Sequence, residues 1–149
     1  MDVVKIAERL GIQIVESGFD PGVSGLIVRK DGKVFLGVNE TDAAVRKRFT
    51  IAHELGHFTL HMGKTLPLGK PIFVDNVAAR DQSSSRGLIP EEIEANKFAA
   101  ELLMPHSFIS RDVSKADPRK LVEDLADKYD VSQTAMTLRL TNLGYHLST

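Results

Sequence analysis

The chain has 149 residues, of which 42% are hydrophobic, so we expect one compact domain with a sizeable buried core. Its formal net charge of −1 gives no general attraction to nucleic acid or to anionic membranes. It has no cysteine, which excludes disulfides and thiolate metal ligands and fits a cytoplasmic location.

The N-terminal part predicts a helix and then a β-hairpin. An amphipathic helix over residues 1–17 is indicated by apolar residues at helical spacing, namely Val3, Ala7, Leu10 and Ile14. Charges throughout this segment argue against a signal peptide or a membrane span. Asp31-Gly32 then separates two β-prone runs, and this dipeptide favours a type I′ turn, which needs positive φ at both residues. We expect strands over residues 25–30 and 33–39.

A second helix is predicted to begin with Thr41 or Asp42 as its cap and to end near Met62 and Gly63. Its apolar stripe lies opposite His53 and His57, so we expect the histidines to face a cleft; the stripe consists of Ile51, Leu55, Phe58 and Met62. Residues 63–89 predict a long loop, with a possible short strand at 71–74 and disorder around 80–87.

The C-terminal half predicts helices. One begins at Pro90, where proline and two glutamates favour a helix start, and continues to Leu103 before Pro105. Asp117-Pro118 opens another, and Ser132 caps a last one that ends at Gly144. We therefore predict an α+β fold, a single domain over residues 1–149, in which residues 118–144 form a helix-turn-helix-like pair.

A candidate metal site is indicated by the segment His53-Glu54-Leu55-Gly56-His57. Histidines four residues apart on a helix lie one turn apart on one face, so both imidazoles can bind one metal ion, and this pattern is typical of hydrolytic zinc sites. A catalytic zinc needs a third protein ligand. His61 is disfavoured as this ligand, because a straight helix places it about 12 Å along the axis from His53. His61 could instead line the cleft.

The helix over residues 90–103 offers the third ligand. Placed at 100° intervals, Glu92 falls within the apolar arc with Asn96 one turn later, whereas Glu94 is on the solvent face and Glu91 is at the edge. A buried carboxylate needs a partner, and a metal ion would be one. The alternative is a buried salt bridge from Glu92 to Arg46 or Arg48. Asn96 would then orient a ligand by a hydrogen bond.

Two blocks, residues 48–57 (RFTIAHELGH) and residues 92–105 (EIEANKFAAELLMP), resemble the ImmA/IrrE family of zinc metallopeptidases. The resemblance implies a zincin-like fold of the gluzincin type, with a small sheet and hairpin beside the helix that bears the two histidines. It implies Zn²⁺ held by His53, His57 and Glu92, with Glu54 as general base and Asn96 and Arg48 beside them. Known members cleave helix-turn-helix transcriptional repressors, which implies such a repressor as the protein partner.

Three points stay open from the sequence. The donor that stabilises the oxyanion is not identified; the candidates are His61, His106, His146, Tyr129, Tyr145 and Arg48. The edge of the strand at 33–39 could bind substrate by strand addition. The chain could also bind and inactivate a repressor without turnover. Direct DNA binding through residues 118–149 is unpromising, because four basic residues there are balanced by four acidic ones.

Overall fold

A computed structural model of the chain describes residues 2–19, 23–61, 71–76 and 90–147. The chain divides into two compact units, residues 1–99 and residues 100–149. The boundary lies inside helix α4 (Pro90–Leu103), so this helix contributes to both units. The fold is α+β, as predicted. The grouping of all 149 residues into one domain stays a prediction.

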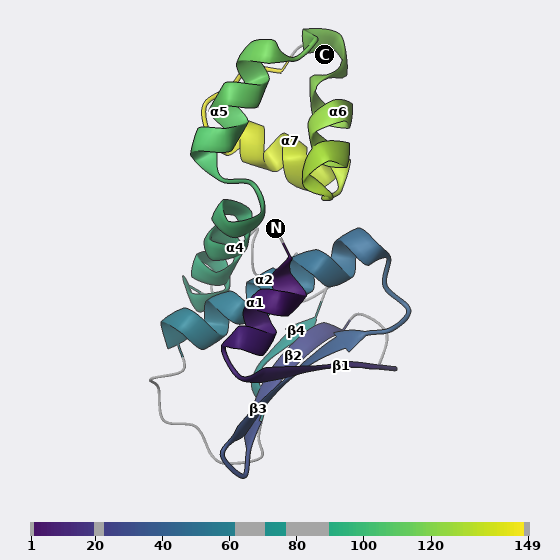
Figure 1. Ribbon diagram of the computed structural model, residues 1–149, viewed down its shortest axis with the longest axis vertical. Coiled ribbons are helices and arrows are strands. Elements are labelled where there is room, and N and C mark those ends of the chain that lie inside the picture. Colours follow the sequence, from purple (N-terminus) through teal and green to yellow (C-terminus); the bar gives the residue numbers. More distant parts are fainter. Residues whose placement is uncertain (1, 20–22, 62–70, 77–89, 148–149) are drawn as a thin grey trace. The chain divides into compact units, whose positions relative to one another are not determined.

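The first unit contains a four-stranded sheet in the order β1-β3-β2-β4 (Figure 1). The strands are β1 (Ile12–Ser17), β2 (Val23–Lys30), β3 (Lys33–Asn39) and β4 (Pro71–Asn76). β3 pairs in parallel with β1 and antiparallel with β2, and β4 pairs antiparallel with the other side of β2. The predicted β2–β3 hairpin is confirmed, since Asp31 and Gly32 both have positive φ, at 52° and 75°. The strand expected at 71–74 is also present as β4.

The helix predicted over residues 1–17 is wrong in its second half. Helix α1 (Val3–Arg9) ends two residues before Gly11, whose φ of +80° suits glycine, and the chain continues as strand β1. Val3 and Ala7 are buried as the helical pattern requires, but Leu10 is 49% exposed. The β-branched residues of Ile12-Gln-Ile-Val15 pair with β3 instead, a long-range contact that helical spacing does not reveal.

β3 is an interior strand, so the predicted substrate-binding edge at residues 33–39 is wrong. One side is paired with β1 over residues 34–39 and the other with β2 over residues 33–38. The hairpin signal shows only that β2 and β3 are neighbours. That signal does not predict the pairing of β1, which precedes the hairpin in the chain and lies on the side of β3 away from β2. The edges of the described sheet are β1 and β4.

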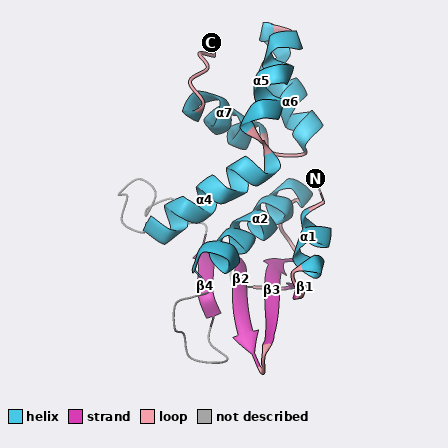
Figure 2. Cartoon of the chain, turned by 60° about the vertical axis from the view of Figure 1, so that its left-hand side comes forward, coloured by secondary structure: helices cyan, strands magenta, loops and turns pink. Residues whose placement is uncertain are grey.

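Helix α2 (Ala44–His61) packs against β2 and β3 and beside α1 (Figure 2). It begins at Ala44, later than predicted. Of the two predicted caps, Thr41 donates its hydroxyl to Asn39 Oδ1 at 2.8 Å, and Asp42 lies two residues before the helix. Met62 and Gly63, like the loop expected to be disordered at 80–87, lie outside the described residues. The core of this unit is formed by apolar side chains of all its layers: Val3, Ala7, Ile12, Ile27, Leu36, Val38, Ile51, Ala52, Leu55, Ala95 and Ala99.

The second unit contains α5 (His106–Lys115), the 3₁₀ turn η1 (Pro118–Lys120), α6 (Leu121–Tyr129) and α7 (Gln133–Asn142). Helix α5 was not predicted, although Ile109 and Val113 have helical spacing. The predicted cap of α7 is confirmed, because Ser132 Oγ accepts the Ala135 N–H at 3.0 Å. Arg139 of α7 donates to Met104 O at the end of α4 and pairs with Glu101.

A polar network joins α5 and α6 within this unit. Asp112 is buried and accepts hydrogen bonds from the Tyr129 hydroxyl and, at 2.9 Å, from Lys128 Nζ. These two hydrogen bonds hold the pKa of Asp112 below its ordinary value, while burial and the Asp112 charge raise that of Tyr129 to about 12. No described helix is long and apolar enough to cross a membrane.

Candidate metal centre

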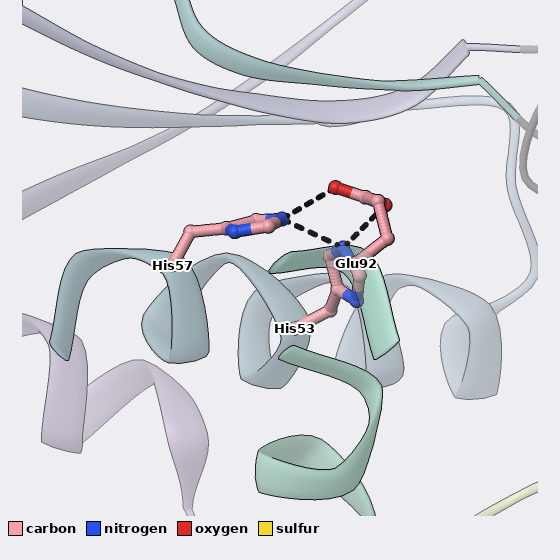
Figure 3. Close-up of side chains that lie close together, drawn as sticks. All are labelled: His53, His57 and Glu92. Atoms are coloured by element: carbon pink, nitrogen blue, oxygen red, sulfur yellow. Dashed lines mark hydrogen bonds and ion pairs between the residues drawn. The ribbon is translucent and has the colours of Figure 1, made fainter. Parts of the chain in front are cut away.

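The two histidines of α2 and Glu92 of α4 meet at one point in the first unit (Figure 3). His57 Nε2 lies 2.7 Å from Glu92 Oε1, and His53 Nε2 lies 3.2 Å from Glu92 Oε2. The two Nε2 atoms are 3.1 Å apart. One ligand atom from each residue can be chosen so that all three lie within 4.8 Å of one another. Three donor atoms that suit a metal ion therefore converge.

Helix α2 supplies the two imidazoles because residues four apart share a face, and Gly56 between them lets α4 approach. A Cβ atom on Gly56 would lie 3.1 Å from Ala95 Cα and 3.1 Å from Phe98 Cβ, closer than nearly all real Cβ contacts. The close approach of the helices brings the first turn of α4, with Glu92, over the histidines. A glycine inside a helix lowers helix propensity, and here it serves this packing.

The cluster is shielded from water. Both histidine side chains are 0% exposed and that of Glu92 is 13% exposed. Burial by itself raises the pKa of Glu92, but hydrogen bonds and charge from His53 and His57 outweigh it and hold this pKa well below its ordinary value. The carboxylate is therefore ionised at neutral pH and available as an anionic ligand.

Asn96 fixes the orientation of one imidazole. Its Oδ1 lies 2.7 Å from His53 Nδ1. An amide oxygen can only accept a hydrogen bond, so Nδ1 carries the proton and donates it. When a metal ion is bound, the neutral ring would offer it the lone pair of Nε2, which is the atom that faces Glu92 and His57. This arrangement is the usual one for a metal-binding histidine.

The spacing of the donor atoms fits a four-coordinate metal ion. Bonds of about 2.0–2.1 Å in a tetrahedral arrangement place neighbouring ligand atoms roughly 3.4 Å apart. The two Nε2 atoms, 3.1 Å apart, are close to this separation. The carboxylate has two oxygens, Oε1 at 2.7 Å from His57 Nε2 and Oε2 at 3.2 Å from His53 Nε2, so an oxygen of Glu92 lies close to each imidazole. Two imidazoles and a carboxylate form a donor set suited to zinc and similar divalent ions.

Glu54 lies beside this cluster on the face of α2 that packs against the sheet. Its side chain is 0% exposed. A Cβ atom on Gly25 of β2 would lie 3.9 Å from Glu54 Cγ and 2.3 Å from Thr50 Cγ2. The backbone of β2 thus passes close to Glu54, and the histidines and Glu54 are buried rather than turned to an open cleft.

The remaining predicted site residues lie as follows. On α4, Glu94 is exposed and Glu91 is half-buried. This agrees with the helical arrangement, which placed Glu94 on the solvent face and Glu91 at the edge of the apolar arc. Arg46, considered as a partner of Glu92, donates two hydrogen bonds to Ser24 Oγ, at 3.0 Å and 3.2 Å. Arg48 is half-buried on α2.

The structure also describes most of the candidates for oxyanion stabilisation. His106 is exposed at the start of α5, in the second unit, and His146 is exposed too. The Tyr129 hydroxyl donates to Asp112 and the Tyr145 hydroxyl to Ser110 Oγ, so both hydroxyls have partners in the second unit. The side chain of His61 lies outside the described residues. The oxyanion donor stays unidentified.

Three residues that shape this centre were not predicted from the sequence: Gly25, Gly56 and Thr50. A glycine within a strand or a helix signals a close approach of another backbone, so the two glycines carried a signal that could have been read. The partner of each approach, however, is set by packing between segments that are far apart in the sequence.

Comparisons with known proteins agree with the geometry. The sequence model of the IrrE N-terminal-like domain, a peptidase family, matches residues 7–141. This range includes the whole candidate centre and extends into both units. A search of curated proteins finds no match.

Proposed function

The chain belongs to the IrrE N-terminal-like family of peptidases, and from this premise we propose that it is a zinc-dependent endopeptidase with a zincin-like fold of the gluzincin type. The observation that carries the proposal is the convergence of His53, His57 and Glu92, three donor atoms in a largely buried site. The ligands come from two helices, α2 and α4. This division is the one that the resemblance to gluzincins implied.

His53, His57 and Glu92 would hold the metal, leaving one tetrahedral position open. When bound there, zinc supplies a Lewis acid that activates water and polarises a peptide carbonyl. Asn96 would accept a hydrogen bond from the Nδ1 proton of His53 and so orient Nε2 toward the metal. Glu54 would accept a proton from the attacking water and transfer it to the leaving amine nitrogen. Burial of Glu54 excludes bulk water from this transfer.

The substrate is expected to bind along β4. Within the described sheet only one side of β4 is paired, with β2, and the proposal is that the other side receives the substrate by strand addition. β4 also lies next to the part of β2 that passes over Glu54, because Gly25 is paired with Asp75. β1, the other edge, is separated from β2 by β3. This proposal replaces the prediction that placed substrate on β3.

A helix-turn-helix repressor is the proposed substrate, on the support of the family resemblance. The test is incubation of the protein with the repressor encoded nearby, with zinc or with a chelator, followed by mass determination of the products. Two new fragments with zinc and none with chelator are expected. An intact repressor in both samples would contradict this substrate.

Two variants test the roles of the site residues. Glu54→Gln should keep zinc and lose cleavage, whereas Glu92→Ala should lose zinc. Glu94→Ala, on the exposed face of the same helix, is the matched control and should keep both. If Glu54→Gln still inactivates the repressor, the chain acts as a binding module without turnover. Stoichiometric zinc in Glu92→Ala would contradict the ligand assignment.

A further inference from the structure

Thr50 carries a hydroxyl where packing alone would favour an apolar group. It lies on α2 one helical turn before Glu54, and it is 0% exposed. Its hydroxyl oxygen has no hydrogen-bond partner within the part of the chain that the structure describes. A helical threonine often donates to the carbonyl of the preceding turn, and a buried hydroxyl without a partner destabilises the folded state. The Thr50 hydroxyl therefore destabilises the folded state and makes no hydrogen bond that would compensate for this.

The contact between Thr50 and the sheet is made by its methyl group. A Cβ atom on Gly25 would lie 2.3 Å from Thr50 Cγ2, so the methyl group occupies the space that a side chain on Gly25 would need. Valine has the same branched shape as threonine and would keep this contact. Packing against β2 therefore explains the methyl group of Thr50 and leaves its hydroxyl unexplained.

Gly25 also places Thr50 and Glu54 side by side. The same hypothetical Cβ atom lies 3.9 Å from Glu54 Cγ, so the two side chains flank one point of the β2 backbone. On a helix, the Cβ atoms of residues four apart are about 5–6 Å from each other, within reach of a hydroxyl-to-carboxylate hydrogen bond. Both side chains are fully buried, so bulk water does not compete for such a bond.

We propose that Thr50 is a positioning residue for Glu54, and that its hydroxyl donates a hydrogen bond to the Glu54 carboxylate in the zinc-loaded enzyme. This bond would hold the carboxylate at the angle needed to accept a proton from water. The inference rests on the proposed function, because it takes Glu54 as the general base. It assigns a part in catalysis to the hydroxyl of Thr50, a residue that is not a metal ligand.

The experiment compares Thr50→Val, which removes the hydroxyl and keeps the shape, with Thr50→Ser, which keeps the hydroxyl and removes the methyl group. Thr59→Val is the matched control, because Thr59 is exposed on the same helix. Three properties are measured on the full chain: the zinc content, the urea midpoint of unfolding without metal, and the turnover with zinc on a mixture of internally quenched fluorescent peptides. The turnover is given as kcat and KM.

Thr50→Val should unfold at higher urea, by about 0.5–1 M, because it removes a buried hydroxyl without a partner. It should bind as much zinc as the unchanged protein, while kcat falls about tenfold and KM changes less than about twofold. Thr50→Ser should recover most of the lost kcat. Thr59→Val should leave all three properties unchanged.

Three results would overturn the role of Thr50: full kcat in Thr50→Val, a lower urea midpoint in that variant, or loss of its zinc. The first would show that the hydroxyl is dispensable, and the other two would give it a structural role. If the unchanged protein cleaves no better than Glu54→Gln, the proposed function itself fails. The unfolding midpoint needs no turnover, so it separates this failure from that of the Thr50 inference.

Discussion

Replacing Gly56 by alanine tests whether the distance between α2 and α4 sets the metal site. The added Cβ atom would lie 3.1 Å from Ala95 Cα, 3.1 Å from Phe98 Cβ and 3.2 Å from Ala95 O. Two of these atoms belong to the backbone, so no side-chain rotation relieves the contact. Helix α4 would have to move away by a few tenths of an ångström, and it carries both Glu92 and Asn96.

Such a movement is large on the scale of metal coordination. Ligand distances are fixed within about 0.2 Å, and loss of an orienting partner typically lowers metal affinity about 10- to 100-fold. Intrinsic helix propensity acts in the opposite direction, because alanine is better than glycine by about 1 kcal/mol inside a helix. Gly56→Ala should therefore bind zinc about 10- to 100-fold more weakly, without the loss of metal-free stability expected of a disrupted core.

The assay is a zinc titration in competition with a chromophoric chelator, paired with urea unfolding of the metal-free protein. Thr59→Ala, at an exposed position of the same helix, is the control and should keep the affinity of the unchanged protein. Zinc affinity equal to that of the unchanged protein in Gly56→Ala would refute the reasoning. It would mean that the site adapts to the helix spacing, and that the close packing at Gly56 does not position Glu92.

Three further predictions concern residues around the site and in the second unit. Asn96→Ala should weaken zinc binding about 10- to 100-fold, because the His53 Nδ1 proton loses its acceptor, and the same competition titration measures this. Gly25→Ala should lower the free energy of unfolding by about 1–3 kcal/mol, since the new methyl group meets Thr50 Cγ2 at 2.3 Å and Gly37 O at 2.9 Å; an unchanged urea midpoint would contradict it. Hydrogen bonds from Tyr129 and Lys128 lower the pKa of Asp112 in the folded protein. The ionised carboxylate therefore stabilises the fold at pH values above the pKa of about 3.9 that Asp112 has in the unfolded chain. This stabilisation is lost as the pH falls through the lower pKa of the folded state. Asp112→Asn should therefore unfold more easily at pH 7 and approach the unchanged protein below pH about 4, and an equal difference at both pH values would count against this.

The sequence by itself determined the local elements and the chemistry of the donors. The β2–β3 hairpin follows from Asp31-Gly32, because this dipeptide favours the two-residue type I′ turn, in which both residues have positive φ. The bounds of α4 follow from Pro90 and Pro105, and the placement of Glu92 on its buried side follows from 3.6-residue periodicity. These properties depend on residues within one or two turns of each other.

Only the tertiary structure decided which elements became neighbours. Residues 12–17 continue a helical pattern, yet they form β1, because hydrogen bonds to β3 outweigh a weak local preference. That pairing also made β3 an interior strand and left β4 as the edge nearest Glu54. The close approaches at Gly25 and Gly56 depend on backbone from other segments, so the sequence names the donors of the site while packing fixes the distances between them.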